Sequence, residues 1–179
     1  YLELFHGATI AFKDMALSIL PHLLTTSAKK NHVENEIVIL TATSGDTGKA
    51  ALAGFADVPG TRIIVFYPKN GVSPIQEKQM VTQKGKNVKV VGIHGNFDDA
   101  QSRVKALFGD KELEKELAEG GFQFSSANSI NIGRLVPQVA AGCEHLVCVP
   151  FNIHYTRNFC KIFSGVFVNI CTCRRTESQ

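Results

Sequence analysis

The sequence predicts an α/β fold in which an open, mostly parallel sheet carries helices on both faces. Short apolar runs rich in Val and Ile alternate with helical segments along the chain. The first two runs are separated by a glycine turn and a helical stretch, which is the order of a β-α-β unit. Each run is apolar almost throughout, as expected for parallel strands that are buried on both faces.

Four segments have the composition and length of strands in such a sheet. They are EIVILTAT at 36–43, RIIVFYP at 62–68, VKVVGI at 88–93 and HLVCVP at 145–150. A helix is predicted at 49–55, between the first two strands, and further helical segments separate the later ones. Apart from its one strand, the tail at 139–179 shows no sustained hydrophobic period, so we predict no fold for it.

Several helix ends are visible in the sequence. Ser73, followed by Pro74 and Gln76, forms a capping box with proline at the first helical position. Asp98, followed by Gln101, predicts a second capped start by the same logic. A Gly-Gly pair then ends the charged stretch DKELEKELAE, whose Glu and Lys spacing is typical of a solvated helix face.

The bulk composition excludes several classes of function. The chain has 179 residues, of which 44% are hydrophobic and 20% charged, enough for one domain with a real core. The net charge is +3 and the charges are scattered, so neither nucleic acid nor a membrane surface is an expected partner. No apolar stretch approaches the ~20 residues of a membrane span, and we expect a cytoplasmic protein. Because the chain opens at Tyr1 instead of methionine, we also expect residues ahead of it.

The cysteines do not suggest a disulfide framework or a metal site. Their number is odd and all lie in the last quarter of the chain: Cys143, Cys148, Cys160, Cys171 and Cys173. Reduced thiols are the expected state. The last two form a CxC pair without a second matching pair, so zinc is not expected.

The first candidate site lies in HGATIAFKD, which leads into a predicted helix. One face of this helix carries, at steps of three or four, Lys13, Leu17, Leu20 and Leu24. A lysine on an apolar stripe has its ammonium form disfavoured and its pKa lowered, as a nucleophilic amine requires. The alternative is a surface lysine whose stem covers apolar residues.

Two neighbours of this lysine have structural interpretations. Asp14 is better explained as a first-turn acid favoured by the helix dipole than as a catalytic base. Pro21 is predicted to kink or end the helix.

The second candidate is the turn SGDTG, with Ser44, Gly45, Asp46 and Thr47. It joins a strand to a helix at the carboxyl end of the sheet, where open α/β folds bind ligands and where a helix amino terminus favours an anion. A nucleotide P-loop is excluded, because only two residues separate the glycines and Ala50 stands where a magnesium-binding hydroxyl is required. A plain strand-to-helix turn is the alternative.

The third candidate is SSANSINIGR at 125–134, which concentrates hydroxyls, amides and one guanidinium. Arg134 can form a paired interaction with a phosphate, and Asn128 and Ser129 can complete its hydrogen bonds. A polar turn followed by a helix with one surface arginine is the alternative.

Taken together, these segments resemble threonine synthases in order and spacing. The resemblance covers about residues 2–138 and rests on five blocks: ELFHGATIAFKD, TATSGDTGKAAL, FYPKNGVSPIQEKQM, GNFDDAQ and SSANSINIGRLVPQ. Ala8 stands where the family pattern has proline. The family consists of pyridoxal-phosphate (PLP) enzymes of fold type II, similar to the tryptophan synthase β-subunit, and converts O-phospho-L-homoserine and water into L-threonine and phosphate.

The resemblance implies a role for each candidate residue. Lys13 would bear the cofactor and then transfer protons, with Phe12 either beside the cofactor or in the core. The SGDTG turn, through Ser44 to Thr47, would hold the substrate carboxylate. The substrate phosphate would be bound by Asn128, Ser129 and Arg134.

The resemblance stops before the tail. After a strand like LVCVP the family continues into a glycine loop of the form TGNFGN that holds the cofactor phosphate, whereas this chain has PFNIHYTRNFCK. We therefore expect 139–179 to be a divergent tail from a truncated or frame-shifted copy. Three hypotheses stay open: an active threonine synthase, an inactive remnant, and another fold type II lyase such as a dehydratase or a cysteine synthase relative. Self-association is also open.

Overall fold

The structure of the protein, a computed structural model, describes residues 3–137. These residues fall within one unit, Leu2–Gly142. The elements in chain order are α1 (Asp14–Lys30), β1 (Glu36–Ala42), α2 (Asp46–Phe55), β2 (Thr61–Pro68), α3 (Pro74–Val81), β3 (Val88–Ile93), α4 (Phe97–Gly109), α5 (Lys111–Glu119) and β4 (Phe122–Ser126). The strand predicted at 145–150, the five cysteines and the tail at 139–179 lie outside the described residues.

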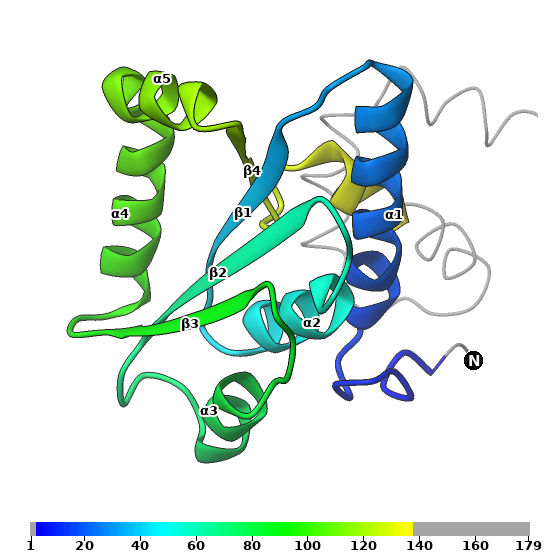
Figure 1. Cartoon of the computed structure of the whole chain (residues 1–179). Coiled ribbons are helices and arrows are strands. Elements are labelled where there is room, and N and C mark those ends of the chain that lie inside the picture. The colour runs from blue at the N-terminus through cyan, green and yellow to red at the C-terminus, as the bar shows by residue number, and fades with distance from the viewer. Residues whose placement is uncertain (1–2, 138–179) are drawn as a thin grey trace, which may run out of the picture. The chain divides into compact units, whose positions relative to one another are not determined.

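The four strands form one parallel sheet in the order β3-β2-β1-β4 (Figure 1). The chain first builds outward from β1 to β2 and β3, then returns to the other side of β1 to add β4. The strand order thus reverses at β1, with β2 and β3 on one side and β4 on the other, which makes the gap between the ends of β1 and β4 the topological switch point. The predicted fold class is confirmed.

The strand β4 was not predicted. It pairs with β1 in register, with Leu40 opposite Ser126. Its short FQFSS sequence alternates apolar and polar side chains and stays mostly half-buried at the sheet edge, so it lacks the continuous apolar run that marks the inner strands.

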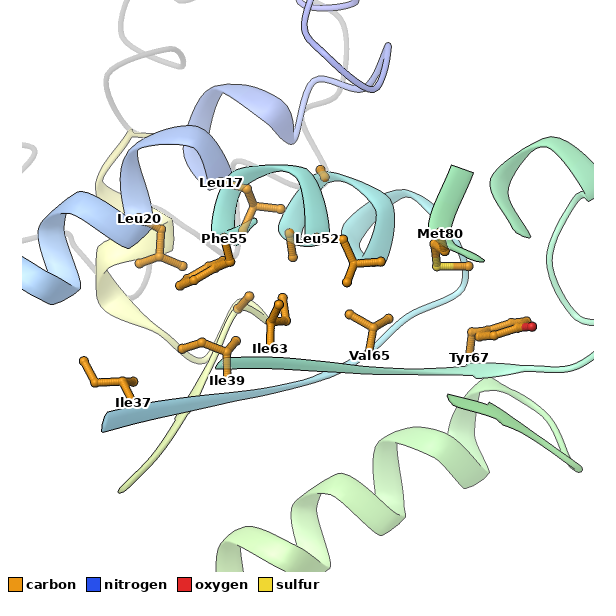
Figure 2. Packing of buried hydrophobic residues seen from close by; sticks show 13 residues of the cluster. Leu17, Leu20, Ile37, Ile39, Leu52, Phe55, Ile63, Val65, Tyr67 and Met80 are labelled. Carbon is orange, nitrogen blue, oxygen red and sulfur yellow. The ribbon is translucent and has the colours of Figure 1, made fainter. Parts of the chain in front are cut away.

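Side chains on alternate positions of the strands enter two separate cores. One core lies between the sheet and helices α1, α2 and α3, and Figure 2 shows Leu17 and Phe55 of these helices above Ile39, Ile63 and Val65 of the strands. The other lies under α4, on the opposite face of the sheet. The apolar stripe predicted on α1 is thus confirmed, because its leucines pack into the first core.

Helices α1 and α2 approach closely at one point, next to Pro21 of α1. The helix continues through Pro21 to Lys30, so of the predicted kink or end the end does not occur. Proline has no N–H, so the carbonyl of Leu17 loses its helical donor. A Cβ built on Gly54 of α2 would overlap this carbonyl oxygen, and its carbon would lie 2.9 Å away. The bare Cα of Gly54 therefore contacts the oxygen that Pro21 releases.

The helix ends were predicted with mixed success. The capping box of α3 is present as predicted, with Ser73 and Gln76 exchanging hydrogen bonds. The cap of α4 is formed by Asn96 and Asp99, so the prediction of Asp98 as the capping residue was wrong. The charged helix α5 has no buried residue, as predicted. No helix within residues 3–137 is long and apolar enough to cross a bilayer.

Candidate active site

The three predicted site segments converge at the switch point. The turn 43–48 follows β1, and the segment 127–134 follows the neighbouring β4. Helix α1 connects directly into β1 and packs against α2, so its first residues lie at the end of the sheet where β1 finishes (Figure 1). The charges of Asp46 and Arg134, from the other two segments, act on Lys13, as expected for groups at the same end of the sheet.

Lys13 is the residue immediately before the first turn of α1. Its backbone is already helical, and its carbonyl accepts the hydrogen bond of the Leu17 amide at 3.0 Å. The side chain is half-buried, with Nζ 5.4 Å from the centroid of the Phe12 ring. Phe12 itself is 51% exposed, so it belongs to the surface around Lys13 and not to the core.

The loop before Lys13 is held by Asp14. Its carboxylate accepts hydrogen bonds from both the amide and the hydroxyl of Thr9, and from the amide of Ala11 at 3.4 Å. The loop can approach the helix closely because Gly7 has no side chain: a Cβ there would lie 2.6 Å from the Cβ of Asp14. Ile10 has a φ of 59°, a left-handed conformation that a β-branched residue rarely adopts. Asp14 therefore fixes a strained loop, in agreement with a structural role.

Electrostatics at Lys13 favour the neutral amine. Burial lowers the pKa of Lys13, and the positive charges of Arg134 and Lys49 lower it further, while the negative charge of Asp46 opposes them. The net result is a pKa below the ordinary value of 10.5. A lysine with this shift is a better nucleophile and proton acceptor near neutral pH than an exposed one.

The SGDTG turn is organised by Thr43, which sequence analysis did not select. Its buried hydroxyl oxygen accepts hydrogen bonds from the amides of Gly45 at 2.9 Å and Gly48 at 2.8 Å. Gly45 has a φ of 133°, which disfavours any side chain. In the described part of the chain, the amides of Asp46 and Thr47 have no acceptor, as is usual in the first turn of a helix. These two N–H groups can receive an anion.

The side chains of the predicted turn residues differ in their surroundings. Ser44 is exposed and Thr47 half-buried. The carboxylate of Asp46 forms an ion pair with Lys49 at 3.0 Å and accepts a hydrogen bond from Gln76 Nε2 at 2.9 Å. Burial tends to raise the pKa of Asp46, but the hydrogen bonds from Gln76 and Lys49 outweigh this and keep the pKa below its ordinary value. The Asp46 side chain is therefore a charged anchor, and only its backbone is suited to bind a carboxylate.

Asn128 extends the pairing of β1 and β4 beyond the ends of the strands. Its side-chain oxygen accepts from the Ala42 amide at 3.2 Å, and its side-chain nitrogen donates to the Ala42 carbonyl at 2.9 Å. Because both polar atoms bond to β1, this side chain joins the two sides of the switch point. Ser129, the next residue, is exposed.

Arg134 is a buried cation beside Lys13. The residue is only 2% exposed, and its Nη1 donates a hydrogen bond to the carbonyl of Ala127 at 2.7 Å. Asn131 shapes this segment, because its side chain donates to the Ser126 carbonyl and accepts from the Gly133 amide. The alternative of a surface arginine is wrong. Asn131, like Thr43, could be recognised only from the backbone groups it contacts.

Known proteins with a similar fold and sequence show what this chain is related to. A threonine synthase of Buchnera aphidicola is 44% identical to the chain over 137 residues, which cover 76% of this chain and 30% of that protein. The crystal structure of threonine synthase from Escherichia coli aligns with a TM-score of 0.71 and 41% identity, covering 84% of this chain and 33% of that one. The chain is homologous to threonine synthases over most of its length.

A PLP-bound threonine synthase from Brucella melitensis gives a similar result, with a TM-score of 0.69 and 38% identity over 84% of this chain and 32% of that one. No protein-family model matches the chain. The chain spans about a third of the length of these threonine synthases.

The candidate site has a distinct charge pattern. Lys13, Lys49 and Arg134 contribute three positive charges, and Asp46 is the one negative charge that acts on Lys13 among the described residues. Residues 3–137 contain no cluster of His, Cys, Asp and Glu that could hold a metal ion. The arrangement suits an anionic ligand that reaches both the amine and the backbone amides of α2.

Proposed function

We propose that this chain carries the lysine-bearing part of a PLP-dependent lyase that converts O-phospho-L-homoserine and water into L-threonine and phosphate. The observation that carries the proposal is the position of Lys13. Its half-buried amine, with a lowered pKa, lies at the switch point between an open helix amino terminus and the buried Arg134. The homologous threonine synthases support the reaction assigned.

The described residues fit the attachment of PLP to Lys13. An aldehyde needs a neutral amine, and the lowered pKa of Lys13 makes that form easier to reach than for an exposed lysine. Phe12 supplies an aromatic ring beside the amine and has enough exposed surface to contact a planar ring. PLP, when bound, supplies an electron sink for carbanions next to the substrate nitrogen. The place of the family's phosphate-holding loop falls outside 3–137, and there this chain has PFNIHYTRNFCK instead of a glycine loop.

Each site residue then has a role that follows from its contacts. The amides of Asp46 and Thr47 bind the substrate carboxylate at the start of α2, while the hydroxyl of Thr43 holds the turn in shape. Nζ of Lys13 accepts a proton from one substrate carbon and returns it to another as phosphate leaves and water adds.

Phosphate binding is assigned to the segment after β4. Arg134 supplies the positive charge and Ser129 an exposed hydroxyl, in a place where a leaving phosphate gains from preorganised donors. Asn128 was expected to touch the phosphate as well. Because both of its polar atoms bond to Ala42, we propose instead that it fixes the distance between this segment and β1.

The proposal extends to a cytoplasmic location and to self-association. Small phosphorylated amino acids are substrates of cytoplasmic metabolism, and the chain has the composition of such an enzyme. Exposed apolar side chains surround the site and the outer face of α1: Ile10, Phe12, Met15, Ile19, Leu23, Ile130, Ile132 and Val136. Such a surface gives self-association a driving force.

Cofactor labelling tests the proposal. The 179-residue chain is mixed with PLP, scanned for the yellow absorbance of a lysine-bound cofactor, reduced with borohydride, digested and mapped by mass spectrometry. We expect the label on Lys13 and its loss in Lys13→Ala. Phosphate release from O-phospho-L-homoserine is then measured on the same preparations.

The outcomes separate the hypotheses. Label on Lys13 with phosphate release supports the lyase. Label on Lys13 with amino-acid deamination in place of phosphate release would favour a dehydratase, and a folded chain without label would leave the inactive remnant. Arg134→Met is the matched variant for the phosphate, because it removes the charge and keeps most of the side-chain volume; we expect it to retain the label and to lose phosphate release.

A further inference from the structure

Gln76 connects two helices at the edge of the site. Its side-chain oxygen accepts from the amide and hydroxyl of Ser73 at 3.1 and 3.0 Å, which completes the cap of α3. Its side-chain nitrogen donates to the Asp46 carboxylate on α2 at 2.9 Å. A Cβ on Gly45 would meet this same nitrogen at 2.6 Å, so the turn lies directly against the Gln76 amide.

The frame that presents Gln76 is rigid. Helix α3 is tied to β2 by a hydrogen bond of 2.7 Å from the Tyr67 hydroxyl to Glu77, and its Met80 is fully buried in the first core. A Cβ on Gly48 of α2 would lie 2.8 Å from the sulfur of Met80, so α2 and α3 pack closely just beyond the turn. The Gln76 amide therefore has little freedom to leave Asp46.

We propose that Gln76 is a positioning residue for the site: it holds the Asp46 carboxylate against Lys49 and so sets the negative charge that acts on Lys13. Within the described residues, no hydrogen bond joins Gln76 to Lys13. The Gln76 amide packs against Gly45 of the turn and bonds to Asp46, whose other partner, Lys49, is 8% exposed and equally fixed. While Gln76 and Lys49 both bond to it, the Asp46 carboxylate stays between α2 and α3, where the positive charge of Lys49 offsets its negative charge. The backbone amides of the turn then remain free for an anion.

The other charged groups near Lys13 do not offer an alternative route. Arg134 comes from the segment after β4 and bonds to Ala127, and Asp14 on α1 bonds to Thr9 and Ala11. Gln76 and Lys49 both bond to Oδ1 of Asp46, so without Gln76 this carboxylate would be held by Lys49 alone. The carboxylate would then turn toward Lys13, the nearest cation apart from Lys49 that acts on it, and would favour the ammonium form.

The reactivity of Lys13 tests this inference without cofactor or substrate. The whole chain is labelled with trace acetic anhydride across a range of pH, and acetylation of the Lys13 peptide is measured relative to the exposed Lys111. We expect Gln76→Met to slow acetylation of Lys13 about threefold at pH values below the Lys13 pKa. A threefold change corresponds to a modest part of the free energy that a hydrogen bond to a charged group contributes. Asp46→Asn should accelerate it, because the opposing negative charge is lost.

Two matched controls separate the effect of Gln76 on Asp46 from its role in the cap of α3. Ser73→Ala weakens the cap of α3 but keeps the bond from Gln76 to Asp46, so it should leave the Lys13 profile unchanged. In an Asp46→Asn background, Gln76→Met should have no further effect, since the route is already removed. If Gln76→Met fails to fold, Gln76→Glu serves instead, because glutamate keeps the capping box but cannot donate to Asp46; it too should slow acetylation.

Three results would overturn the inference: an unchanged profile in Gln76→Met or Gln76→Glu, an equal slowing in Ser73→Ala, or a Gln76→Met effect that persists without Asp46. The inference depends on the proposed function only for the identity of the reactive lysine. Failure of PLP to label Lys13 would refute the proposed function and leave the acetylation result valid.

Discussion

The contact between Gly54 and Leu17 makes a strong prediction, because the same change has opposite expected effects at two glycines. Gly54→Ala places a methyl group against the Leu17 carbonyl, 2.9 Å from its carbon, where about 3.5–4.0 Å is comfortable. Helices α1 and α2 must separate by roughly 1 Å to accept it. Alanine at Gly109, the last residue of α4, would meet nothing within 4 Å.

The magnitude follows from what the separation disturbs. Three side chains at this interface, Leu17, Leu20 and Phe55, are fully buried, and each contributes about 2 kcal/mol to stability. A gap of this size removes a quarter to a half of the stabilisation from such contacts, or about 1.5–3 kcal/mol. The better helix propensity of alanine offsets about 1 kcal/mol. We expect a net destabilisation of about 0.5–2 kcal/mol, which lowers the melting temperature by about 1–8 °C in a chain of this length.

Urea unfolding followed by circular dichroism measures the effect for both variants. Gly109→Ala should be neutral or slightly stabilising, since only the propensity term applies. The separation also moves Lys13 away from Asp46, so Gly54→Ala should change the acetylation profile of Lys13 while Gly109→Ala should not. A Gly54→Ala chain as stable as Gly109→Ala would refute the close approach of the two helices.

Three further predictions concern charged groups. Asp14→Ala removes the acceptor for Thr9 and should cost about 1–2 kcal/mol and speed proteolysis within 7–12, measured by limited digestion. Lys13 has a pKa lower than its ordinary 10.5, so its positive charge destabilises the folded state at pH values below the folded pKa. This destabilisation decreases as the pH rises from the folded pKa toward 10.5. Lys13→Met should therefore raise the urea midpoint of unfolding at pH 7, and the increase should be smaller in alkaline buffer. Asp46 has a pKa below 3.8, so its contribution is present above that pH and lost as the pH falls further; Asp46→Asn should flatten the acid side of the stability curve.

Sequence patterns were sufficient where a single element determines the structure. The strands β1, β2 and β3 were predicted almost to the residue, because buried parallel strands need continuous apolar runs. The capping box of α3 was also predicted, since all its partners lie within four residues. Helix α2 begins three residues before the predicted start: its N-cap is Gly45 of the turn, and the Thr43 hydroxyl accepts from the Gly48 amide in its first turn.

Sequence patterns failed where the decisive contact comes from another element. Pro21 would end an isolated helix, but Gly54 of α2 covers the carbonyl that it frees. Asn128 has a side chain typical of ligand-binding residues, yet both polar atoms of its amide form hydrogen bonds with the backbone of Ala42 in β1. Gln76 was predicted as a cap only, and its second partner lies 30 positions away along the chain.

The charge pattern of the site connects its stability to its function. Burial and two neighbouring cations make the ammonium form of Lys13 unfavourable, and one carboxylate opposes them. Within the described residues this arrangement lowers stability, because like charges are held together away from water. An anion bound at the start of α2 and beside Arg134 would relieve that repulsion, and it would do so most when the ligand carries two negative charges. A site that is destabilised without its ligand therefore favours the doubly charged phosphate of the proposed substrate over a carboxylate alone.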